Sequence, residues 1–86
     1  MFRVVYEKRV SKDLDKIPNN IVRKILTIFN ELSVNPMPIG SKKLSGKDAF
    51  YRIRQGDYRI VYLIDYKKKL VQIVLIVHRK DVYRQI

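Results

Sequence analysis

Three arginines, Arg52, Arg54 and Arg59, are the residues whose types and spacing best suit chemistry in this sequence. They lie in two runs rich in β-branched and aromatic residues, F-Y-R-I-R-Q and Y-R-I-V-Y, which flank Gly56-Asp57. A two-residue loop that begins with Gly between alternating strands is typical of a β-hairpin. In that register Arg54 faces Arg59, and all three arginines share one side of the hairpin because side chains alternate along a strand.

The arginine side of this hairpin favours an anion. Like charges placed opposite each other across two strands weaken a sheet, so the arrangement is poor for stability alone. Guanidinium groups bind phosphate oxygens in a bidentate manner and keep their charge at any working pH, so phosphate is the first anion to consider. A solvated basic surface is the alternative. It is less favoured here because neither Asp nor Glu occupies that side of the hairpin.

A pocket of Arg, Tyr and His suits the cleavage of RNA without a metal. The ribose 2′-hydroxyl is its own nucleophile, so the protein needs only to align it, stabilise the charge of the transition state and move protons. Arginines stabilise charge but do not release a proton at neutral pH. His78 and Tyr83, in the C-terminal run H-R-K-D-V-Y, are therefore the candidate proton carriers, and the residues leave open which of them acts.

Composition and charge narrow the class of protein. The 86 residues make one domain, residues 1–86. Nineteen Lys and Arg against eight Asp and Glu give a net charge of +11, which favours nucleic acid, an acidic protein or an anionic surface as the partner. With no cysteine and one histidine, the sequence offers no disulfide or clustered metal ligands, and no cofactor is expected. It has no signal peptide or membrane-spanning apolar run, so we expect a cytoplasmic protein without membrane contact.

Apolar periodicity predicts a strand and two helices in the first half of the chain. The run F-R-V-V-Y at 2–6 predicts a first strand. Apolar residues at helical spacing then predict a short helix that ends at Pro18. A second helix, capped by Asn19 or Asn20, ends at Asn35-Pro36. Together these helices are expected to form an antiparallel pair.

The second half of the chain predicts strands around the arginines. Residues 39–48 predict a loop or a poorly regular strand before the hairpin. The nearly continuous apolar run 70–77 predicts a central strand covered on both faces. If Asp65 pairs with Leu70, then Arg59 lies beside Ile76. Strict alternation would then put His78 on the arginine side and Arg79 on the other, but a strand's last residue often departs from it, so the side of each stays open.

These elements combine into an α+β fold of order β-α-α-β-β-β, a small, mostly antiparallel twisted sheet with the N-terminal helical pair packed on one face. Four apolar residues of the hairpin would then lie beneath the helices, namely Tyr51, Ile53, Tyr58 and Ile60. The three arginines would lie on the open face.

Four runs resemble the RelE/ParE superfamily of toxins from type II toxin–antitoxin pairs. They are K-L-S-G at 43–46, Y-R-I-R at 51–54, D-Y-R-I-V-Y at 57–62 and H-R-K-D-V-Y at 78–83, the last being similar to the RelE side. The resemblance covers the chain end to end. It implies a RelE-like microbial RNase fold and an mRNA interferase, which enters the ribosomal A site and cuts the codon there by 2′-hydroxyl attack.

The resemblance also implies a set of site residues. The expected catalytic residues are Arg52, Arg54, Arg59, Arg79, Tyr83 and His78. RelE-like toxins often carry lysines at the positions matching Arg52 and Arg54, and arginine there keeps the charge but removes groups that could titrate, which shifts proton transfer to Tyr83 or His78. Basic residues around the hairpin are expected to bind RNA, namely Lys42, Lys43, Lys47 and Lys80.

The same resemblance implies an acidic, RelB-like antitoxin that wraps the toxin in a hetero-oligomer and neutralises its basic face. Two rival functions stay open. One is a ParE-like toxin that inhibits DNA gyrase without being an enzyme, although an inhibitor would not need so many arginines to converge with a tyrosine. The other is a basic RNA-binding module without catalysis.

Overall fold

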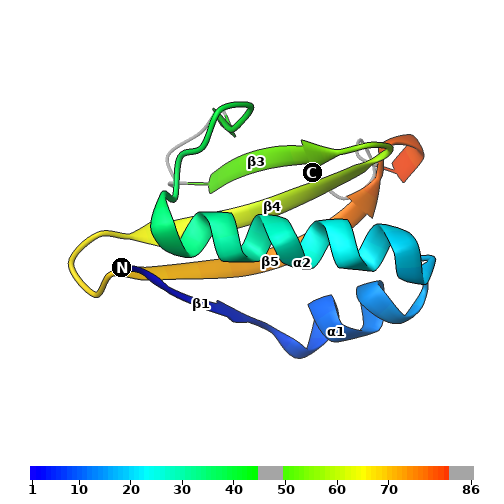
Figure 1. Ribbon diagram of the computed structural model, residues 1–86, viewed down its shortest axis with the longest axis horizontal. Helices are drawn as coiled ribbons and strands as arrows, with labels where there is room; N and C mark the ends of the chain where they lie inside the picture. The colour runs from blue at the N-terminus through cyan, green and yellow to red at the C-terminus, as the bar shows by residue number, and fades with distance from the viewer. Residues whose placement is uncertain (45–49, 82–86) are drawn as a thin grey trace.

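The computed structural model describes residues 1–44 and 50–81, and its elements follow the predicted order (Figure 1). The helices are α1 (Lys8–Asp15) and α2 (Asn19–Val34), with a short 3-10 turn, η1 (Arg79–Asp81), at the end of the described chain. The strands are β1 (Arg3–Tyr6), β2 (Lys42–Lys43), β3 (Phe50–Gln55), β4 (Tyr58–Asp65) and β5 (Leu70–His78). They form one sheet in the order β1-β5-β4-β3-β2, in which only β1 and β5 are parallel. The predicted α+β class is confirmed.

The helices begin and end close to the predicted positions, with one difference at the start of α2. The N-cap of α2 is Pro18, whose carbonyl oxygen accepts hydrogen bonds from the N–H groups of Ile21 and Val22 at 2.9 and 3.0 Å. The prediction that Asn19 or Asn20 caps this helix was wrong, because the fixed φ of proline already brings the chain into the helix at the next residue. The predicted end of α2 is confirmed, with Asn35 as its C-cap.

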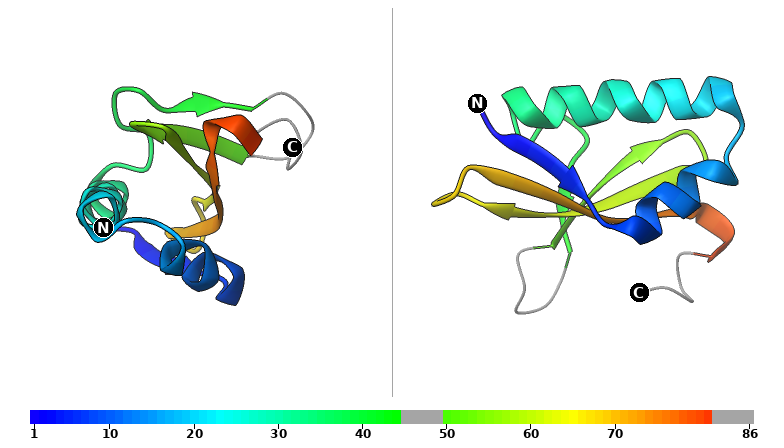
Figure 2. Two further views of the ribbon diagram at one scale, coloured as in Figure 1. Left: turned by 90° about the vertical axis from the view of Figure 1, so that its right-hand side faces the viewer. Right: turned by 90° about the horizontal axis from the view of Figure 1, so that it is seen from below.

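Both helices lie on the same side of the sheet and cover the main core (Figure 2). The apolar side of the hairpin packs there as predicted, with Tyr51, Ile53 and Ile60 buried and Tyr58 half-buried. Tyr62 is fully buried in this layer and donates a hydrogen bond from its phenol to the Pro36 carbonyl oxygen at 2.8 Å. Neither helix of the described chain has the length and hydropathy of a membrane span.

Strand β5 lies inside the sheet, between β1 and β4, whereas the sequence predicted a central strand, the place that β4 takes. It also contains a bulge that the sequence did not predict. Asp65 pairs with Leu70 as expected, and the register shifts where Val61 pairs with Leu75 while Tyr62 pairs with Ile73. The extra residue is Val74. Arg59 therefore faces Val77, and the predicted pairing of Arg59 with Ile76 was wrong, because a bulge adds one residue to one strand and displaces all later pairs.

Helix α1 lies beside β5 at the point where β1 has ended. The last β1 residue, Tyr6, pairs with Ile73. Further along β5, beyond this last pair with β1, the Ile76 N–H donates to Asp13 Oδ2 at 3.2 Å. A side chain of α1 thus satisfies a backbone group of β5.

A second, smaller apolar cluster lies on the face of the sheet away from the helices. Its buried residues are Val61, Leu75 and Val77. Leu44 and Phe50, which flank the segment 45–49, pack against it. The arginine face is therefore built on an apolar base rather than on an open sheet surface.

Candidate functional site

The hairpin of β3 and β4 places the three predicted arginines on one face. The register predicted from the sequence is confirmed, with Arg54 opposite Arg59 and Arg52 opposite Val61. Strand β2 adds a fourth cation to this face, because Lys42 pairs with Arg52. We call Lys42, Arg52, Arg54 and Arg59 the arginine face.

Arg59 is the most enclosed cation of the arginine face. Its side chain is half-buried, it lies between Arg54 and Val77 in the sheet, and its Nε is buried without a hydrogen-bond partner among the residues that the structure describes. A buried N–H of a charged group that stays unpaired costs about 1–3 kcal/mol or more. An oxyanion bound at this face would supply the acceptor that Arg59 lacks.

Arg54 and Arg52 surround Arg59 in different ways. Arg54 is exposed, and its Nε donates to the Gly56 carbonyl oxygen at 3.2 Å, so its guanidinium is held against the hairpin turn. Gly56 has φ of +58°, a conformation that suits glycine at the first position of this two-residue turn. Arg52 is half-buried opposite Val61 and is the next residue of β3 on the same face as Arg54, further from the turn.

Arg79 reaches the same end of the sheet from η1. Its backbone N–H donates to the Asp57 carbonyl oxygen at 2.7 Å, and its Nε lies 3.8 Å from Asp57 Oδ1. Both side chains are more than half exposed, at 58% and 61%, so this ion pair is weak and a phosphate can replace the carboxylate. Sequence reasoning missed Asp57 as a partner because the residue lies in the turn and not on the arginine side of either strand.

His78 lies on the opposite face of the sheet. It pairs with Tyr58 across β4 and β5, and the two rings meet edge to face with centroids 5.2 Å apart. The sequence left the side of His78 open, and the structure places it away from the arginine face because the bulge at Val74 moves each later residue of β5 to the other face. The sheet itself now separates the imidazole from the arginine face.

The remaining predicted residues divide into three groups. Lys43 pairs with Tyr51 and is exposed on the edge strand β2. Lys80 is exposed in η1, where its backbone N–H donates to His78 Nδ1 at 3.2 Å. Lys47 and Tyr83 lie outside the described residues, so their predicted roles stay predictions.

The fold and this basic face define a toxin domain of the RelE/ParE superfamily. Residues 4–83 match the family model described as the ParE toxin of the type II toxin–antitoxin system parDE, and the chain belongs to this family. The resemblance predicted from the sequence motifs is confirmed.

Within that superfamily the chain is a RelE-like toxin. It is 34% identical over 85 residues to toxin RelE3 of Methanocaldococcus jannaschii, with 94% of each chain covered. It is 30% identical over 84 residues to toxin RelE of Mycobacterium tuberculosis, covering 96% of this chain and 87% of that protein.

Solved structures support the same assignment. The RelBE2 toxin–antitoxin complex of Mycobacterium tuberculosis contains a chain that matches with a TM-score of 0.80 and 29% identity, covering 91% of this chain and 98% of that one. The archaeal RelE–RelB complex of Pyrococcus horikoshii contains one with a TM-score of 0.79 and 30% identity, covering 91% and 94%.

Proposed function

We propose that this toxin is a metal-independent endoribonuclease that cuts mRNA in the ribosomal A site. The observation that carries the proposal is the facing pair Arg54 and Arg59, with the buried Nε of Arg59 unpaired among the described residues. Two guanidinium groups forced together on an apolar base repel each other until an anion lies between them. A scissile phosphodiester gains further negative charge in the transition state, so it is held most tightly when the bond is breaking.

Each basic residue takes a separate part in this reaction. Arg54 and Arg59 hold the scissile phosphate. Arg52 and Lys42 hold the neighbouring phosphate of the RNA. The Arg79 side chain leaves its ion pair with Asp57, binds the scissile phosphate of the RNA and stabilises the developing negative charge. The attacking nucleophile is the ribose 2′-hydroxyl, which displaces the 5′-oxygen of the next nucleotide and leaves a cyclic phosphate.

Proton transfer is assigned to Tyr83. His78 was the other candidate, but the sheet lies between its ring and the arginine face. We propose that Tyr83 takes the proton of the 2′-hydroxyl and returns it to the leaving 5′-oxygen. Lys43, Lys47 and Lys80 are proposed to contact the RNA backbone at a distance from the cleaved bond.

The proposed partner of the free toxin is an acidic, RelB-like antitoxin. The solved RelB–RelE complexes that this chain resembles support such a partner, and so does the net charge of +11. A segment rich in Asp and Glu would neutralise the arginine face and keep RNA away from it.

The proposal is tested with wild-type protein and the variants Arg59→Ala, Arg79→Ala and Tyr83→Phe on ribosomes programmed with a defined mRNA. We expect each arginine variant to lower the cleavage rate by about 10²-fold or more, as removal of one group that stabilises an oxyanion does. Tyr83→Phe should lower it by about 10²–10⁴-fold, as loss of a proton-transfer group does. Lys12→Ala, an exposed change on α1 away from this face, is the matched control and should keep the wild-type rate. Variants that fold and cut as fast as this control would contradict the assignment of the site.

A second candidate function is the inhibition of DNA gyrase, because the family model that matches residues 4–83 is named for the ParE toxin. A supercoiling assay on the same protein samples separates the two functions. Inhibition of supercoiling by wild type, with ribosome-bound mRNA left intact, would favour the inhibitor over the ribonuclease.

A further inference from the structure

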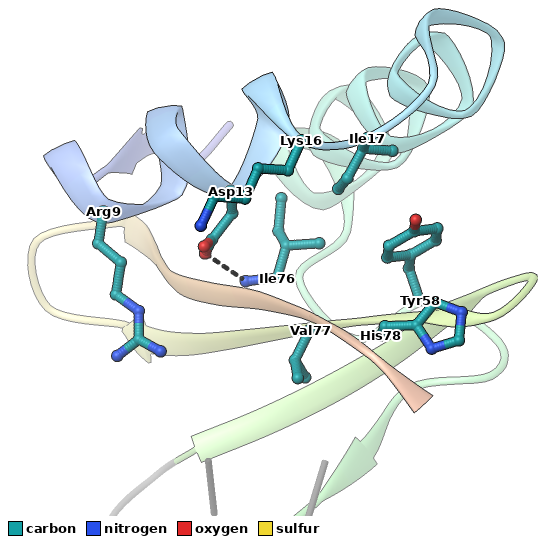
Figure 3. Close-up of a pocket in the computed structure, with 8 residues that line it drawn as sticks. All are labelled: Arg9, Asp13, Lys16, Ile17, Tyr58, Ile76, Val77 and His78. Carbon is teal, nitrogen blue, oxygen red and sulfur yellow. Dashed lines mark hydrogen bonds between the residues drawn. The ribbon is translucent and has the colours of Figure 1, made fainter. Parts of the chain in front are cut away.

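A cavity of about 280 Å³ lies on the helix side of the sheet, between α1 and the C-terminal end of β5 (Figure 3). This volume is close to the lower end, about 300 Å³, of the range typical of small-molecule sites. Arg9 and Lys16 line it from the α1 segment, while Tyr58 and His78 line it from the sheet. The cavity therefore combines two cations with two aromatic rings, the pairing that single-stranded nucleic-acid sites use.

The two rings are held in place before any ligand arrives. Tyr58 and His78 are both half-buried and meet at an interplanar angle of 89°. The Lys80 N–H donates to His78 Nδ1 at 3.2 Å, which fixes the orientation of the imidazole ring. The face of a ring held in this way can stack on a nucleobase.

The charged groups divide between the wall and the rim. Asp13 lies at the wall, where its Oδ2 accepts the Ile76 N–H, and its carboxylate can also accept from an N–H of a base (Figure 3). Arg9 and Lys16 are both exposed. Arg9 extends from α1 toward the strands, whereas the Lys16 side chain runs along α1 toward Asp13 (Figure 3). These cations make the rim of the cavity basic, which suits a phosphate.

The cavity lies directly behind the arginine face. Arg59 pairs with Val77, and the next pair along the same two strands is Tyr58 with His78, whose side chains point to the other face. The two sites therefore occupy opposite sides of one end of the sheet. Any RNA strand that occupied both sites would have to pass around this end of the sheet.

We propose that this cavity binds one nucleotide of the RNA strand next to the cleaved bond. The base stacks on the face of one ring of the Tyr58–His78 pair and meets the other ring edge to face. One edge N–H of the base points toward Asp13, and its phosphate lies against Lys16 and Arg9. The choice of mRNA as the natural ligand rests on the function proposed above, whereas nucleotide binding itself rests on the cavity.

The first test is an NMR titration of the full chain with adenosine 5′-monophosphate, with inorganic phosphate as the comparison ligand. We expect the nucleotide to shift the ring signals of Tyr58 and His78 and the amide signal of Ile76, and phosphate alone to leave the ring signals in place. Shifts confined to the arginine face with both ligands would overturn the proposal.

The second test measures binding of a fluorescent 2′-O-methyl hexaribonucleotide, which the toxin cannot cut. We expect Lys16→Glu and His78→Ala to weaken binding at least about 5-fold, the low end of what one stacked base contributes. His78→Phe keeps an aromatic face and should recover most of the affinity. Lys12→Glu makes the same charge change on the same helix outside the cavity, so it measures the general electrostatic loss.

These measurements separate the cavity from the proposed function. If Lys16→Glu and His78→Ala bind the hexanucleotide as Lys12→Glu does, the cavity proposal is overturned whether or not the toxin cuts mRNA. If wild type leaves ribosome-bound mRNA intact, the proposed function fails while the binding series still decides on the cavity. Lys16 is exposed, so Lys16→Glu tests the proposal even if His78→Ala unfolds the chain.

Discussion

Arg59 shows how a single residue can lower stability in favour of a charged site. It faces Arg54 directly, and its buried Nε lacks a partner in the described part of the chain. Each of these features costs free energy in the unbound protein. A residue chosen for folding alone would be apolar at this position, since Val77 lies beside it.

Replacing Arg59 with Met should therefore stabilise the free toxin while reducing its activity. We expect the free energy of unfolding to rise by about 1 kcal/mol, because the substitution removes a like-charge pair and an unpaired buried N–H. Urea unfolding and the ribosome cleavage assay measure the two effects. Arg54→Met relieves the same repulsion but removes no buried N–H, so a larger gain there than at Arg59 would contradict this account.

Tyr62 gives the fold a dependence on alkaline pH. Burial raises the pKa of its phenol from 10.0 to about 12, because the phenolate would lose its contact with water. The folded protein therefore holds this proton more tightly than the unfolded chain does. The corresponding stability is complete below pH 10 and is lost as the pH rises from 10 to 12.

The variant Tyr62→Phe tests this at alkaline pH. We expect wild type to lose up to about 2–3 kcal/mol more stability than the variant between pH 9 and pH 12. Near pH 7 the variant should be less stable by about 1 kcal/mol, since it lacks the hydrogen bond to the Pro36 carbonyl oxygen. Urea unfolding at several pH values gives both quantities, and parallel pH curves for the two proteins would refute the assignment.

At the scale of elements, the end of β5 pairs with β4 on one side and contacts α1 on the side where β1 has ended. Strand β1 stops at the pair Tyr6 and Ile73, and the Asp13 carboxylate then accepts the Ile76 N–H. This contact also positions the end of the strand from which the chain enters η1 and Arg79. The first helix thus supports the arginine site from the far side of the sheet.

Removal of the Asp13 carboxylate should loosen the C-terminal end of β5. We expect Asp13→Ala to lower the free energy of unfolding by about 1–3 kcal/mol, the cost of leaving a buried N–H unpaired. Asp13→Asn keeps a carbonyl oxygen and should cost less. Hydrogen exchange of the Ile76 amide is the direct measurement, and equal protection in wild type and Asp13→Ala would show that this hydrogen bond is unimportant.

At the scale of the whole molecule, the net charge of +11 affects the association rate of the toxin with its partners and the salt dependence of binding. Lys and Arg are distributed over both faces of the sheet, including the arginine face and the α1 segment beside the cavity. Such a charge accelerates association with RNA or with an acidic antitoxin and makes binding sensitive to salt.

The salt dependence of RNA binding gives a count of the phosphates that the protein neutralises. For a non-cleavable single strand, the two phosphates assigned to Arg54 with Arg59 and to Arg52 with Lys42 predict a slope of log affinity against log salt near −1.4, from about −0.7 per phosphate. The double variant Arg52→Ala/Arg54→Ala should make this slope shallower, by at most about 1.4. Anisotropy titrations at several salt concentrations measure this, and an unchanged slope would place the RNA elsewhere.

The sequence by itself determined the hairpin, its register and its arginine side. Gly56-Asp57 sets the loop, and the strict alternation of arginine with apolar residues in β3 marks which side faces the core. The ends of the helices followed in the same way from Pro18 and Asn35-Pro36, since proline interrupts helical hydrogen bonding.

Only the tertiary structure decided what lies at the end of β5. The run from Ile73 to Val77 is apolar at every position, so no polar residue marks a face and the bulge at Val74 leaves no trace in the pattern. That one extra residue turns His78 away from the arginine face and toward α1. The position of the bulge depends on packing on both faces of the sheet, because Ile76 lies beneath the helices and Val77 lies in the cluster on the other face. Such contacts join residues that are distant in the chain.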